Sequence, residues 1–490
     1  MSKEYVIGLD IGTTSVKAVV FDRCGKVTVE SEQLTKSFYP QPNYVEQDPE
    51  ALTSASVFVL KDAIQKAGVT PDQVAGIGFS CAMHSLICVD ENGRALSRAI
   101  IWADGRGSDQ AERLISENGM TLYEKTGTPI HPMSPLVKLL WMNETGYEPF
   151  QKAAYFMSVK EYLLLQWFGK RIVDYSMASA TGLFNGATLD WDMEILELVN
   201  VKKEQLSRPV PPTEILTGLN KIIADYIGIP EDIPFVIGAA DGQLANLGSG
   251  AILPGEVAIT AGTSGAVRQW ASGFRANEKH ETFCYMFTGE TSIIGGPTNN
   301  GGIALEWLKN LLNYQGTYEE FTKEAGRVGP GADGILFLPY INGERAPLWN
   351  QHARGNFFGM SITHQKEHFV RAVLEGITFN LYQISEALER LAGPSEKIYV
   401  NGGLARSPIW LQMMADVFGK NIYVSESHHN AAWGAAWTAL VAVGEADSFE
   451  DIKNNLPMGE VIVPNVENHK VYQGIYEKYV RLATDVTKYF

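Results

Sequence analysis

Two short glycine-threonine segments contain residue types that bind phosphate. The first is Asp10-Ile-Gly-Thr-Thr-Ser-Val-Lys17, and the second is Gly262-Thr-Ser-Gly265. Glycine allows backbone N–H groups to approach an anion closely, and threonine hydroxyls add further donors. Asp10 could hold a divalent cation through water, and Lys17 could supply a positive charge. Each segment taken alone is also compatible with an ordinary hairpin turn.

A third segment, Asn401-Gly-Gly-Leu-Ala-Arg406, has the composition of a nucleoside-binding turn. It separates an apolar run from a helix that is expected to begin near Pro408. A Gly-Gly pair at such a junction lets a flat base lie against the backbone at a helix N-terminus. A plain strand-to-helix turn is the alternative interpretation.

Asp241 is the candidate for acid–base chemistry. It lies in Gly238-Ala-Ala-Asp-Gly-Gln243, directly after the apolar residues 234–237. A carboxylate at the carboxyl end of a strand opens into the crevice where α/β proteins bind ligands. There it could accept a proton from a hydroxyl during phosphoryl transfer. The alternative is an N-cap for the turn at residues 243–247.

The elements that must position these residues alternate between strands and helices along the chain. Residues 5–9, 16–21 and 26–30 predict a three-stranded meander, and a helix follows with Asp48 as N-cap and Gly68 at its end. Further helices are expected at 108–117, 135–142, 364–391 and 408–418, and further strands at 74–79, 86–89, 99–102, 334–338 and 397–400. Strands repeatedly followed by helices predict an α/β fold.

The second half of the 490-residue chain begins like the first. Gly12-Thr13 and Gly262-Thr263 lie 250 residues apart, and each pair joins two predicted strands, at 256–260 and 266–270 in the second case. A repeat at half the chain length predicts a two-lobed, internally duplicated fold. We expect an N-terminal lobe at residues 1–250 and a C-terminal lobe at 251–490. Across a cleft, the two hairpins could clasp a nucleoside triphosphate.

Composition argues against several classes of partner and location. Lys and Arg total 40 against 56 Asp and Glu, and the resulting net charge of −16 argues against nucleic acid or an anionic membrane as partner. The four cysteines form no CxxC pair, so neither a zinc ribbon nor a disulfide framework is predicted. Residues 431–444 are too few to span a bilayer and predict a core helix. With no signal peptide visible, we expect a cytoplasmic protein.

Together these segments resemble the FGGY carbohydrate kinases, members of the sugar kinase, Hsp70 and actin superfamily. Met133-Ser-Pro-Leu-Val-Lys-Leu-Leu-Trp141 and residues 355–375, which begin Gly-Asn-Phe-Phe-Gly-Met, are similar to two signatures of that family. The resemblance extends over residues 4–455. It implies a ribonuclease-H-like or actin-like ATPase fold and a sugar kinase that uses ATP and Mg²⁺.

The resemblance also implies residue roles. Asp241 would be the general base on the sugar hydroxyl, and Asp10 would help to hold Mg²⁺. The expected nucleotide-binding residues are Thr13, Thr14, Lys17, Gly262, Thr263, Gly301, Gly402, Gly403 and Arg406. The expected sugar-binding residues are Met83, His84, Trp102, Asp104, Arg106 and His131, together with Asp241. Arg345 matches a family segment to which no role is assigned.

The resemblance narrows the choice of sugar substrate. Glycerol kinases carry an Arg-Glu pair where this chain has Met83-His84, whereas xylulose kinases also carry Met-His. Stretches at residues 80–85, 127–133, 173–179 and 295–302 are most similar to the FGGY gluconate kinases. Phosphorylation of D-gluconate is therefore implied, with Arg106, His84 or His131 as a donor to its carboxylate, unless Arg106 is structurally paired.

Two alternatives remain open at this point. The same chemistry on xylulose or another polyol is the nearest. A nucleotide-driven scaffold of the actin or Hsp70 kind, without sugar kinase activity, is the alternative from another class. The resemblance also implies a homodimer.

Overall fold

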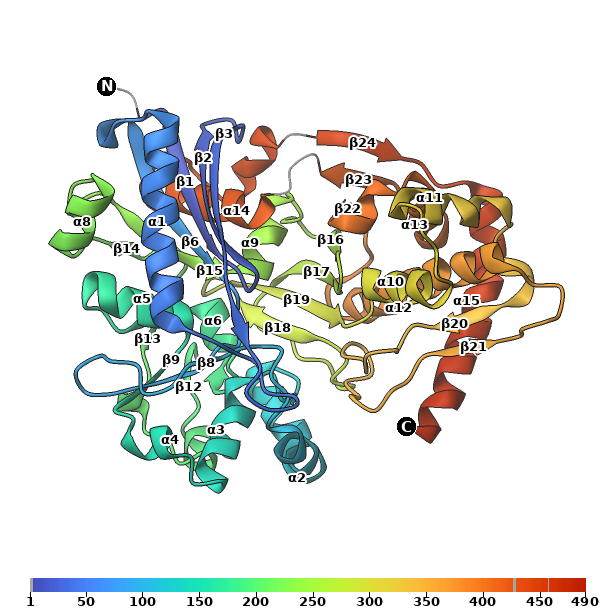
Figure 1. Ribbon diagram of the computed structural model, residues 1–490, viewed down its shortest axis with the longest axis horizontal. Helices are drawn as coiled ribbons and strands as arrows, with labels where there is room; N and C mark the ends of the chain where they lie inside the picture. The colour runs from blue at the N-terminus through green and yellow to red at the C-terminus, as the bar shows by residue number, and fades with distance from the viewer. Residues whose placement is uncertain (1–2, 426–428, 457) are drawn as a thin grey trace. The chain divides into compact units, whose positions relative to one another are not determined.

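A computed structural model describes residues 3–425, 429–456 and 458–490 (Figure 1). The chain forms two compact units, and each is described by itself. The first unit comprises Met1–Ile252, Ala271–Ile293 and His429–Pro457, and the second comprises Leu253–Trp270, Ile294–His428 and Met458–Phe490. Both units combine sheets with helices, which confirms the α/β class. The boundary at residue 250 stays a prediction, since the first unit also includes two segments from the second half.

A six-stranded sheet forms the centre of the first unit. Its strands lie in the order β14 (Ile215–Leu216), β15 (Phe235–Ala240), β6 (Val74–Cys81), β1 (Tyr5–Ile11), β2 (Ser15–Asp22) and β3 (Val27–Leu34). The strands β15, β6 and β1 run parallel to one another, and β1, β2 and β3 form the predicted antiparallel meander. Three neighbouring parallel strands therefore end at one edge of the sheet.

The helix α1 (Pro49–Ala67) has the predicted ends. The Asp48 side chain accepts hydrogen bonds from Glu50 N and Ala51 N, and Gly68 ends the helix in the left-handed conformation. An N-cap of this kind is worth about 1 kcal/mol. Leu52, Val59, Leu60 and other buried residues form its apolar face, which packs on β2 and β3. The local end signals were sufficient here because the cap residues are adjacent in sequence to the helix.

The opposite face of the sheet carries α14 (Asn430–Ala442) and α9 (Asp241–Gly248). The predicted core helix at 431–444 is thus confirmed, and ten of its residues are buried. It lies so close to β6 that a Cβ on Gly78 would be 1.9 Å from the carbonyl oxygen of Ala435. Within the described ranges, no helix is both long and apolar enough to cross a membrane.

Several predicted elements differ in extent from the observed ones, among them a strand and a helix of the first unit. The strand expected at 99–102 is only β8 (Ala99–Ile100), so Trp102 lies in the turn that follows. The helix expected at 108–117 continues as α2 (Ser108–Thr126) because Gly119 is accommodated inside it and Gly127 supplies the left-handed end. The remaining elements of this unit are β4 (Ser37–Phe38), β5 (Glu46–Gln47), β7 (Ile87–Val89), β9 (Tyr155–Met157), β10 (Ile172–Asp174), β11 (Phe184–Asn185), β12 (Asp190–Trp191), β13 (Arg208–Val210), β18 (Phe283–Met286), α3 (Pro135–Glu144), α4 (Glu148–Lys152), α5 (Val159–Phe168), α6 (Tyr175–Ser179), α7 (Met193–Leu198) and α8 (Lys221–Ile227).

The second unit is built on a sheet that contains β17 (Gly265–Ser272), β16 (Glu256–Ala261), β22 (Lys397–Asn401), β23 (Ile422–Ser425) and β24 (Met458–Ile462), in that order. The predicted hairpin at Gly262-Thr263 joins β16 to β17. The predicted helix at 408–418 is α13 (Pro408–Phe418), capped by Ser407. Its other elements are, wholly or in part, β19 (Thr291–Thr298), β20 (Leu336–Leu338), β21 (Asn356–Phe358), α10 (Gly302–Leu311), α11 (Tyr318–Glu324), α12 (Lys366–Ala392) and α15 (Val466–Val486).

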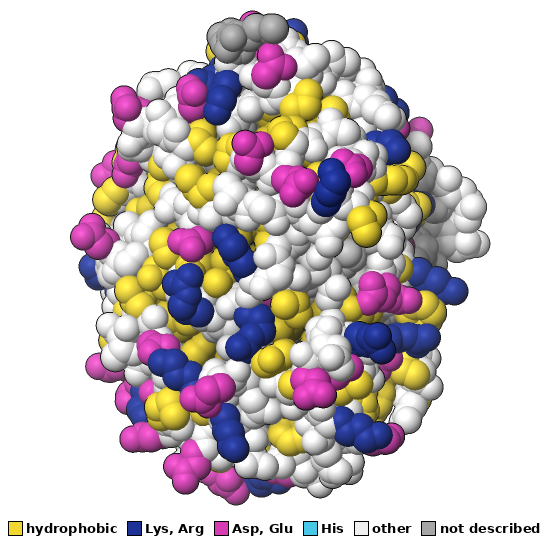
Figure 2. Space-filling view, turned by 90° about the vertical axis from the view of Figure 1, so that its left-hand side faces the viewer, with side chains coloured by type: hydrophobic (Ala, Val, Ile, Leu, Met, Phe, Trp, Pro, Cys, Tyr) yellow, Lys and Arg dark blue, Asp and Glu magenta, His cyan; other side chains and the backbone are white. Residues whose placement is uncertain are grey.

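One face of the molecule shows how the surface charge is distributed. Figure 2 shows lysine and arginine side chains interspersed with aspartate and glutamate, with hydrophobic side chains between them. Mixed charge of this kind does not build a strong field of one sign. The net charge of −16 is therefore not concentrated on the face shown.

Candidate active site

The carboxyl ends of β1, β6 and β15 bring the two candidate carboxylates to one edge of the first sheet. Asp10 pairs with Ser80 across the β1–β6 ladder, and Ala240 pairs with Cys81 across the β15–β6 ladder. Asp241 follows Ala240 directly as the first residue of α9. The carboxyl end of a parallel sheet is where α/β proteins bind ligands. Residues 231 positions apart in sequence thus flank the same strand.

Asp10 is a half-buried carboxylate with a hydroxyl donor. The Oγ atom of Ser80 donates a hydrogen bond to Asp10 Oδ1 at 2.7 Å. Burial raises the pKa of Asp10, while the Ser80 bond and the charge of Lys17 oppose that rise. Lys17 is the cross-strand partner of Asp10, but its ammonium contacts Glu30 at 3.3 Å and Glu32 at 3.2 Å. The ammonium of Lys17 therefore interacts with three carboxylates, those of Asp10, Glu30 and Glu32.

Asp241 stands at the N-terminus of α9. Its Oδ1 atom accepts a hydrogen bond from the neighbouring Gly242 N at 2.7 Å, and the N-cap position of the helix is Ala240. The alternative interpretation of Asp241 as the N-cap of the turn is therefore wrong by one position. The side chain is half-buried, as a group that must reach a substrate hydroxyl requires.

A small pocket in the first unit brings together residues from three predicted segments. Gly12, Thr13, Met83 and Trp102 line it, and its cavity volume of 10 Å³ is the space of one water molecule. The indole N–H of Trp102 donates to Thr13 Oγ1 at 2.9 Å. Sequence reasoning missed Gln47, which also lines the pocket and donates to the Thr13 carbonyl at 2.7 Å. The first phosphate-type hairpin and the expected sugar segments are therefore neighbours.

The two candidate histidines present opposite hydrogen-bonding groups. His84 Nδ1 lies 2.9 Å from the Ala180 carbonyl, which can only accept, so Nδ1 carries the proton and a neutral His84 offers Nε2 as an acceptor. His131 Nδ1 instead accepts from Met133 N at 3.1 Å, so its proton is on Nε2. His84 is 7% exposed and has a left-handed backbone, with φ 69°. His131 is therefore the histidine that is a donor at neutral charge.

A buried lysine fixes the backbone around these sugar-site candidates. The ammonium of Lys138 donates to the carbonyls of His84, Ile100 and Ile101, the last two at 3.1 and 3.0 Å. Lys138 is 0% exposed, and burial lowers its pKa to about 7. It thus joins the Met83-His84 turn to the turn that carries Trp102. Lys138 lies within the first family signature, but its type alone did not indicate this role.

Arg106 is paired with two neighbouring carboxylates. Its Nε and Nη2 atoms donate to both oxygens of Asp104 at 2.8 Å, and Nη2 also donates to Glu46 at 2.7 Å. The guanidinium lies over the rings of Tyr44 and Trp141, and its side chain is 2% exposed. This geometry corresponds to the structurally paired alternative. Asp104, which also accepts from Val45 N at 2.6 Å, is likewise held inside the fold.

The second unit contains a cavity of 540 Å³ at the other predicted binding segments. Gly262, Thr263, Gly403 and Arg406 line it, as does Gly302. Gly301 is the N-cap of α10, and the carbonyls of Gly262 and Thr263 accept from Gly302 N at 2.7 Å and Ile303 N at 3.0 Å. Gly402 lies beside the cavity with φ 100°, where a Cβ would be 2.5 Å from the Ala261 carbonyl. In the first unit, Thr14 is exposed at the tip of its hairpin.

Sequence reasoning missed several residues that line this cavity. Glu306 comes from α10, and Tyr318, Glu319 and Thr322 come from α11. The capping box formed by Thr317 and Glu320 was the available signal for the start of α11. A cavity of this size, lined by glycines, a tyrosine and a few polar groups, has the composition of a small-molecule site and fits a nucleoside.

Arg345 follows Glu344, a buried glutamate that binds the residues preceding α10. Glu344 accepts hydrogen bonds from Thr298 Oγ1, Asn299 N and Asn300 Nδ2, at 2.7, 3.0 and 3.1 Å. Arg345 donates through Nη2 to the Thr298 carbonyl at 3.3 Å. Burial raises the pKa of Glu344, and these hydrogen bonds oppose the rise. The pair thereby fixes the residues that precede Gly301 and Gly302.

Comparison with known proteins identifies the family. The profile of the N-terminal domain of the FGGY family of carbohydrate kinases matches residues 5–248, and that of the C-terminal domain matches residues 257–443. The chain belongs to the FGGY family of carbohydrate kinases. It is therefore an enzyme that transfers a phosphoryl group to a sugar, and the family match argues against the scaffold alternative.

The relatives that match nearly the whole chain are named for two different substrates, gluconate and xylulose. A gluconokinase of Bacillus subtilis (strain 168) is 42% identical over 98% of this chain and 95% of its own length. The crystal structure of a gluconate kinase from Lactobacillus acidophilus has a TM-score of 0.95 at 32% identity, covering 98% of both chains. A ligand-bound xylulose kinase from the same organism also has a TM-score of 0.95 at 32% identity, covering 99% of this chain and 98% of its own. The predicted sugar kinase fold and the similarity to gluconate kinases are confirmed.

Proposed function

We propose that this protein transfers the γ-phosphoryl group of ATP to the 6-hydroxyl of D-gluconate. The observation that carries the proposal is the 42% identity to a gluconokinase over 98% of the chain. The xylulose kinases found with it are less similar in sequence, at 31% identity for that of Staphylococcus epidermidis. The proposal agrees with Met83-His84 in place of the Arg-Glu pair of glycerol kinases.

Asp241 is the proposed general base. Its carboxylate accepts the proton of the 6-hydroxyl as that oxygen forms its bond to the γ-phosphorus, and ADP leaves with the electron pair of the broken bond. The position after β15, at the edge shared with Asp10, supports this role. Phosphoryl transfer needs mainly positioning and neutralised charge, so one well-placed base and a fixed sugar suffice.

Asp10 is the proposed protein ligand of Mg²⁺. Its pKa is raised by burial, so a nearby cation would stabilise the ionised carboxylate. The Ser80 hydroxyl supplies one hydrogen bond, and Thr13 adds a hydroxyl in the adjoining turn. Mg²⁺ usually takes one or two carboxylates with waters and phosphate oxygens, which this donor set fits. The ion would neutralise charge on the β- and γ-phosphates.

The 540 Å³ cavity of the second unit is the proposed nucleoside site. Gly403, Arg406 and Tyr318 all line it, so backbone and an aromatic ring are both available to a flat base. Gly262 and Thr263 line the same cavity at the second hairpin, where backbone N–H groups can meet phosphate. Thr13, Thr14 and Lys17 are the proposed phosphate contacts of the first unit.

His131 is the proposed donor to the gluconate carboxylate. Its Nε2 atom carries a proton at neutral charge, whereas a neutral His84 offers an acceptor suited to a sugar hydroxyl. Arg106 is already paired with Asp104 and Glu46, so we assign it to holding the site together. Met83 and Trp102, which line the small pocket beside Thr13, are the proposed apolar and indole contacts of the sugar.

A panel of sugars tests the proposal. D-gluconate, D-xylulose, glycerol and other polyols are offered with ATP and Mg²⁺, and ADP release is measured for each. Gluconate should give the highest kcat/KM. Xylulose is the second candidate, because a xylulose kinase matches the fold as well as a gluconate kinase does, with both TM-scores at 0.95. A higher kcat/KM for xylulose would replace the proposed substrate but keep the chemistry.

The base assignment has its own variant. Asp241→Asn should lower kcat by about 10²–10⁴-fold and leave ATP binding intact, the usual range for a general base. Asp225→Asn, at an exposed position on α8, is the matched control and should keep normal turnover. The predicted homodimer is a separate proposal, which sedimentation of the purified protein checks. The predicted cytoplasmic location stays a prediction.

A further inference from the structure

A buried lysine donates hydrogen bonds to the strand that leads to Asp241. Lys160, on α5, donates through Nζ to the carbonyls of Ile237 and Ala239 at 3.1 and 3.2 Å. It also forms an ion pair with Asp174 Oδ2 at 2.5 Å. The two side chains are 1% and 0% exposed. The lysine therefore contacts β15 at Ala239, two residues before the proposed base.

The strand needs this support because its pairing is interrupted there. The β15–β6 register shifts between Val236 and Ala239. On the other side the β14 ladder ends at Val236, and the N–H groups of Ile237 and Gly238 donate to the carbonyls of Glu214 and Pro212 in the loop before β14. Beyond Val236, the Ile237 and Ala239 carbonyls are bound by the ammonium group. Buried carbonyl oxygens are costly without a donor, so Lys160 stabilises the irregular end of the strand.

The same network reaches the residue immediately before Asp241. Asp174 Oδ1 accepts from the Ser176 backbone N at 3.1 Å and from the Ser176 hydroxyl at 2.5 Å. That hydroxyl oxygen in turn accepts from Ala240 N at 2.8 Å. The carbonyl of Ala239 and the N–H of Ala240 are therefore both fixed by one Lys160–Asp174–Ser176 chain.

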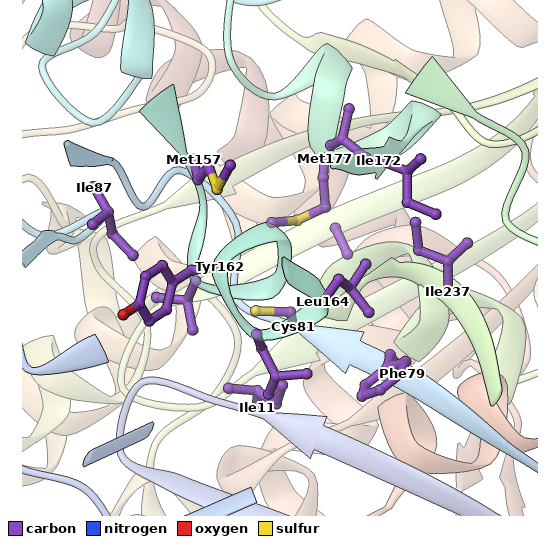
Figure 3. Packing of buried hydrophobic residues seen from close by; sticks show 14 of the residues in the cluster. Ile11, Phe79, Cys81, Ile87, Met157, Tyr162, Leu164, Ile172, Met177 and Ile237 are labelled. Atoms are coloured by element: carbon purple, nitrogen blue, oxygen red, sulfur yellow. The ribbon is translucent and has the colours of Figure 1, made fainter. Parts of the chain in front are cut away.

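Many side chains near this chain are apolar, and the buried Glu161 is a further carboxylate close enough to Asp174 to interact with it. Figure 3 shows Ile237, Ile172, Met177 and Leu164 among the buried side chains of the cluster, with Cys81 beside them. Charges in such an environment interact strongly and are costly to leave unpaired. A buried ion pair is nevertheless weak evidence for stability, because apolar residues often replace one without loss. A positioning role accounts better for an ion pair at this place.

We propose that Lys160, Asp174 and Ser176 are positioning residues that hold Asp241 where it can take the proton of the sugar hydroxyl. The proposal rests on the proposed function, in which Asp241 is the general base. None of the three contacts the reacting atoms in this scheme; they act through the backbone of residues 237–240. A displacement of about 1 Å at a catalytic group can cost about 10²-fold in rate. Residues 173–179, which resemble the gluconate kinases, thereby gain a physical role.

A double-mutant cycle on kcat tests this proposal. Lys160→Met, Asp241→Asn and the combined variant are compared with wild type, on the sugar that the wild type phosphorylates best. Lys160→Met should lower kcat about 10²-fold when Asp241 is present and less than about 2-fold when residue 241 is asparagine. The KM for ATP should stay within about 2-fold of wild type, because the proposed nucleoside site lies in the other unit. A general structural defect would instead lower kcat equally in both backgrounds.

Controls separate positioning from loss of folding. Lys160→Met/Asp174→Asn removes both charges and avoids an unpaired carboxylate, and Ser176→Ala removes only the bond to Ala240 N. Both should show the same dependence on Asp241, with a smaller loss for Ser176→Ala. Arg371→Met breaks another buried ion pair, with Glu375 at 2.7 Å in α12, and should not couple to Asp241.

The outcomes separate the two proposals. Normal kcat in Lys160→Met, or equal losses in both backgrounds for every variant that folds, overturns the positioning role and leaves the base assignment intact. Normal turnover in Asp241→Asn overturns the base assignment, and the positioning role with it. If the sugar panel selects xylulose, the cycle is run on xylulose and the positioning proposal is tested unchanged.

Discussion

Replacing Lys138 by methionine should weaken sugar binding selectively. The substitution keeps most of the apolar stem but removes the ammonium that joins the carbonyls of His84, Ile100 and Ile101. The expected loss can be worked from these three contacts. Ile100 O also accepts from Leu86 N, and Ile101 O also accepts from Asp104 N, at 3.0 and 3.2 Å. Two of the three acceptors therefore keep a backbone donor.

The cost is then close to that of losing one buried hydrogen bond, the one from the charged ammonium to the His84 carbonyl. Such a loss is worth about 1–3 kcal/mol, and the middle of that range, about 2 kcal/mol, corresponds to about 30-fold in an equilibrium constant. If the strain appears in the turns that carry His84 and Trp102, the KM for sugar rises by up to this factor. The KM for ATP should rise by a smaller factor, because the proposed nucleoside site lies in the other unit and the affected turn reaches the proposed phosphate contact Thr13 through the Trp102 indole.

The assay is steady-state kinetics with sugar and ATP varied separately. Lys138→Gln keeps two N–H donors and should give an intermediate KM for sugar. Lys152→Met removes an exposed lysine paired with Glu148 in the same unit, and should leave both KM values unchanged. An unchanged sugar KM in a well-folded Lys138→Met, or equal increases for sugar and ATP, would contradict the proposed role of Lys138 in holding the sugar site.

The effect should also depend on pH with a definite sign. Burial lowers the pKa of Lys138 to about 7 from an ordinary value of 10.5. Below pH 7 the ammonium has three N–H groups for three carbonyls, and above it the neutral amine has only two. The sugar KM of wild type should therefore rise above pH 7 toward that of Lys138→Met. A constant ratio between the two proteins from pH 6 to pH 9 would contradict this assignment.

Three further variants test the site. Arg106→Met should lower kcat/KM for gluconate and for a neutral sugar by similar factors, because its partners are Asp104 and Glu46; a loss confined to gluconate would restore it as a substrate contact. His131→Leu should raise the KM for gluconate about 10-fold, the value of one charge-assisted bond, and change that of xylulose little; equal increases would contradict the carboxylate assignment. Asp10→Asn should raise the Mg²⁺ concentration needed for half-maximal rate, which titration with Mg²⁺ at fixed ATP measures.

Elements with adjacent signals were predictable from sequence. The ends of α1 at Asp48 and Gly68 and the whole of α13 follow from local caps, and the two hairpins follow from glycine between β-branched runs. The edge at which Asp10 and Asp241 meet could be anticipated only as strand ends, since which strands are neighbours depends on pairing across the chain.

The paired states of charged residues could not be predicted in the same way. Lys160 stands in the first turn of a helix, where a lysine is usually solvated, and its burial depends on β15, 77 residues further along. Arg106 could equally have been a substrate contact, because its partner Glu46 lies 60 residues away. Long-range contacts decide whether such a charge is available to a ligand, and a single sequence does not specify them.

A competition between two sugars tests the central claim most directly. D-gluconate and D-xylulose are mixed at equal concentration with limiting ATP, and the ratio of the two phosphorylated products gives the ratio of their kcat/KM values. The site of phosphorylation is read from the coupling of phosphorus to the C6 protons. We expect 6-phosphogluconate in excess of about 10²-fold, because a site that satisfies a carboxylate should reject a neutral sugar. Predominance of xylulose phosphate, or gluconate phosphorylated at another oxygen, would contradict it.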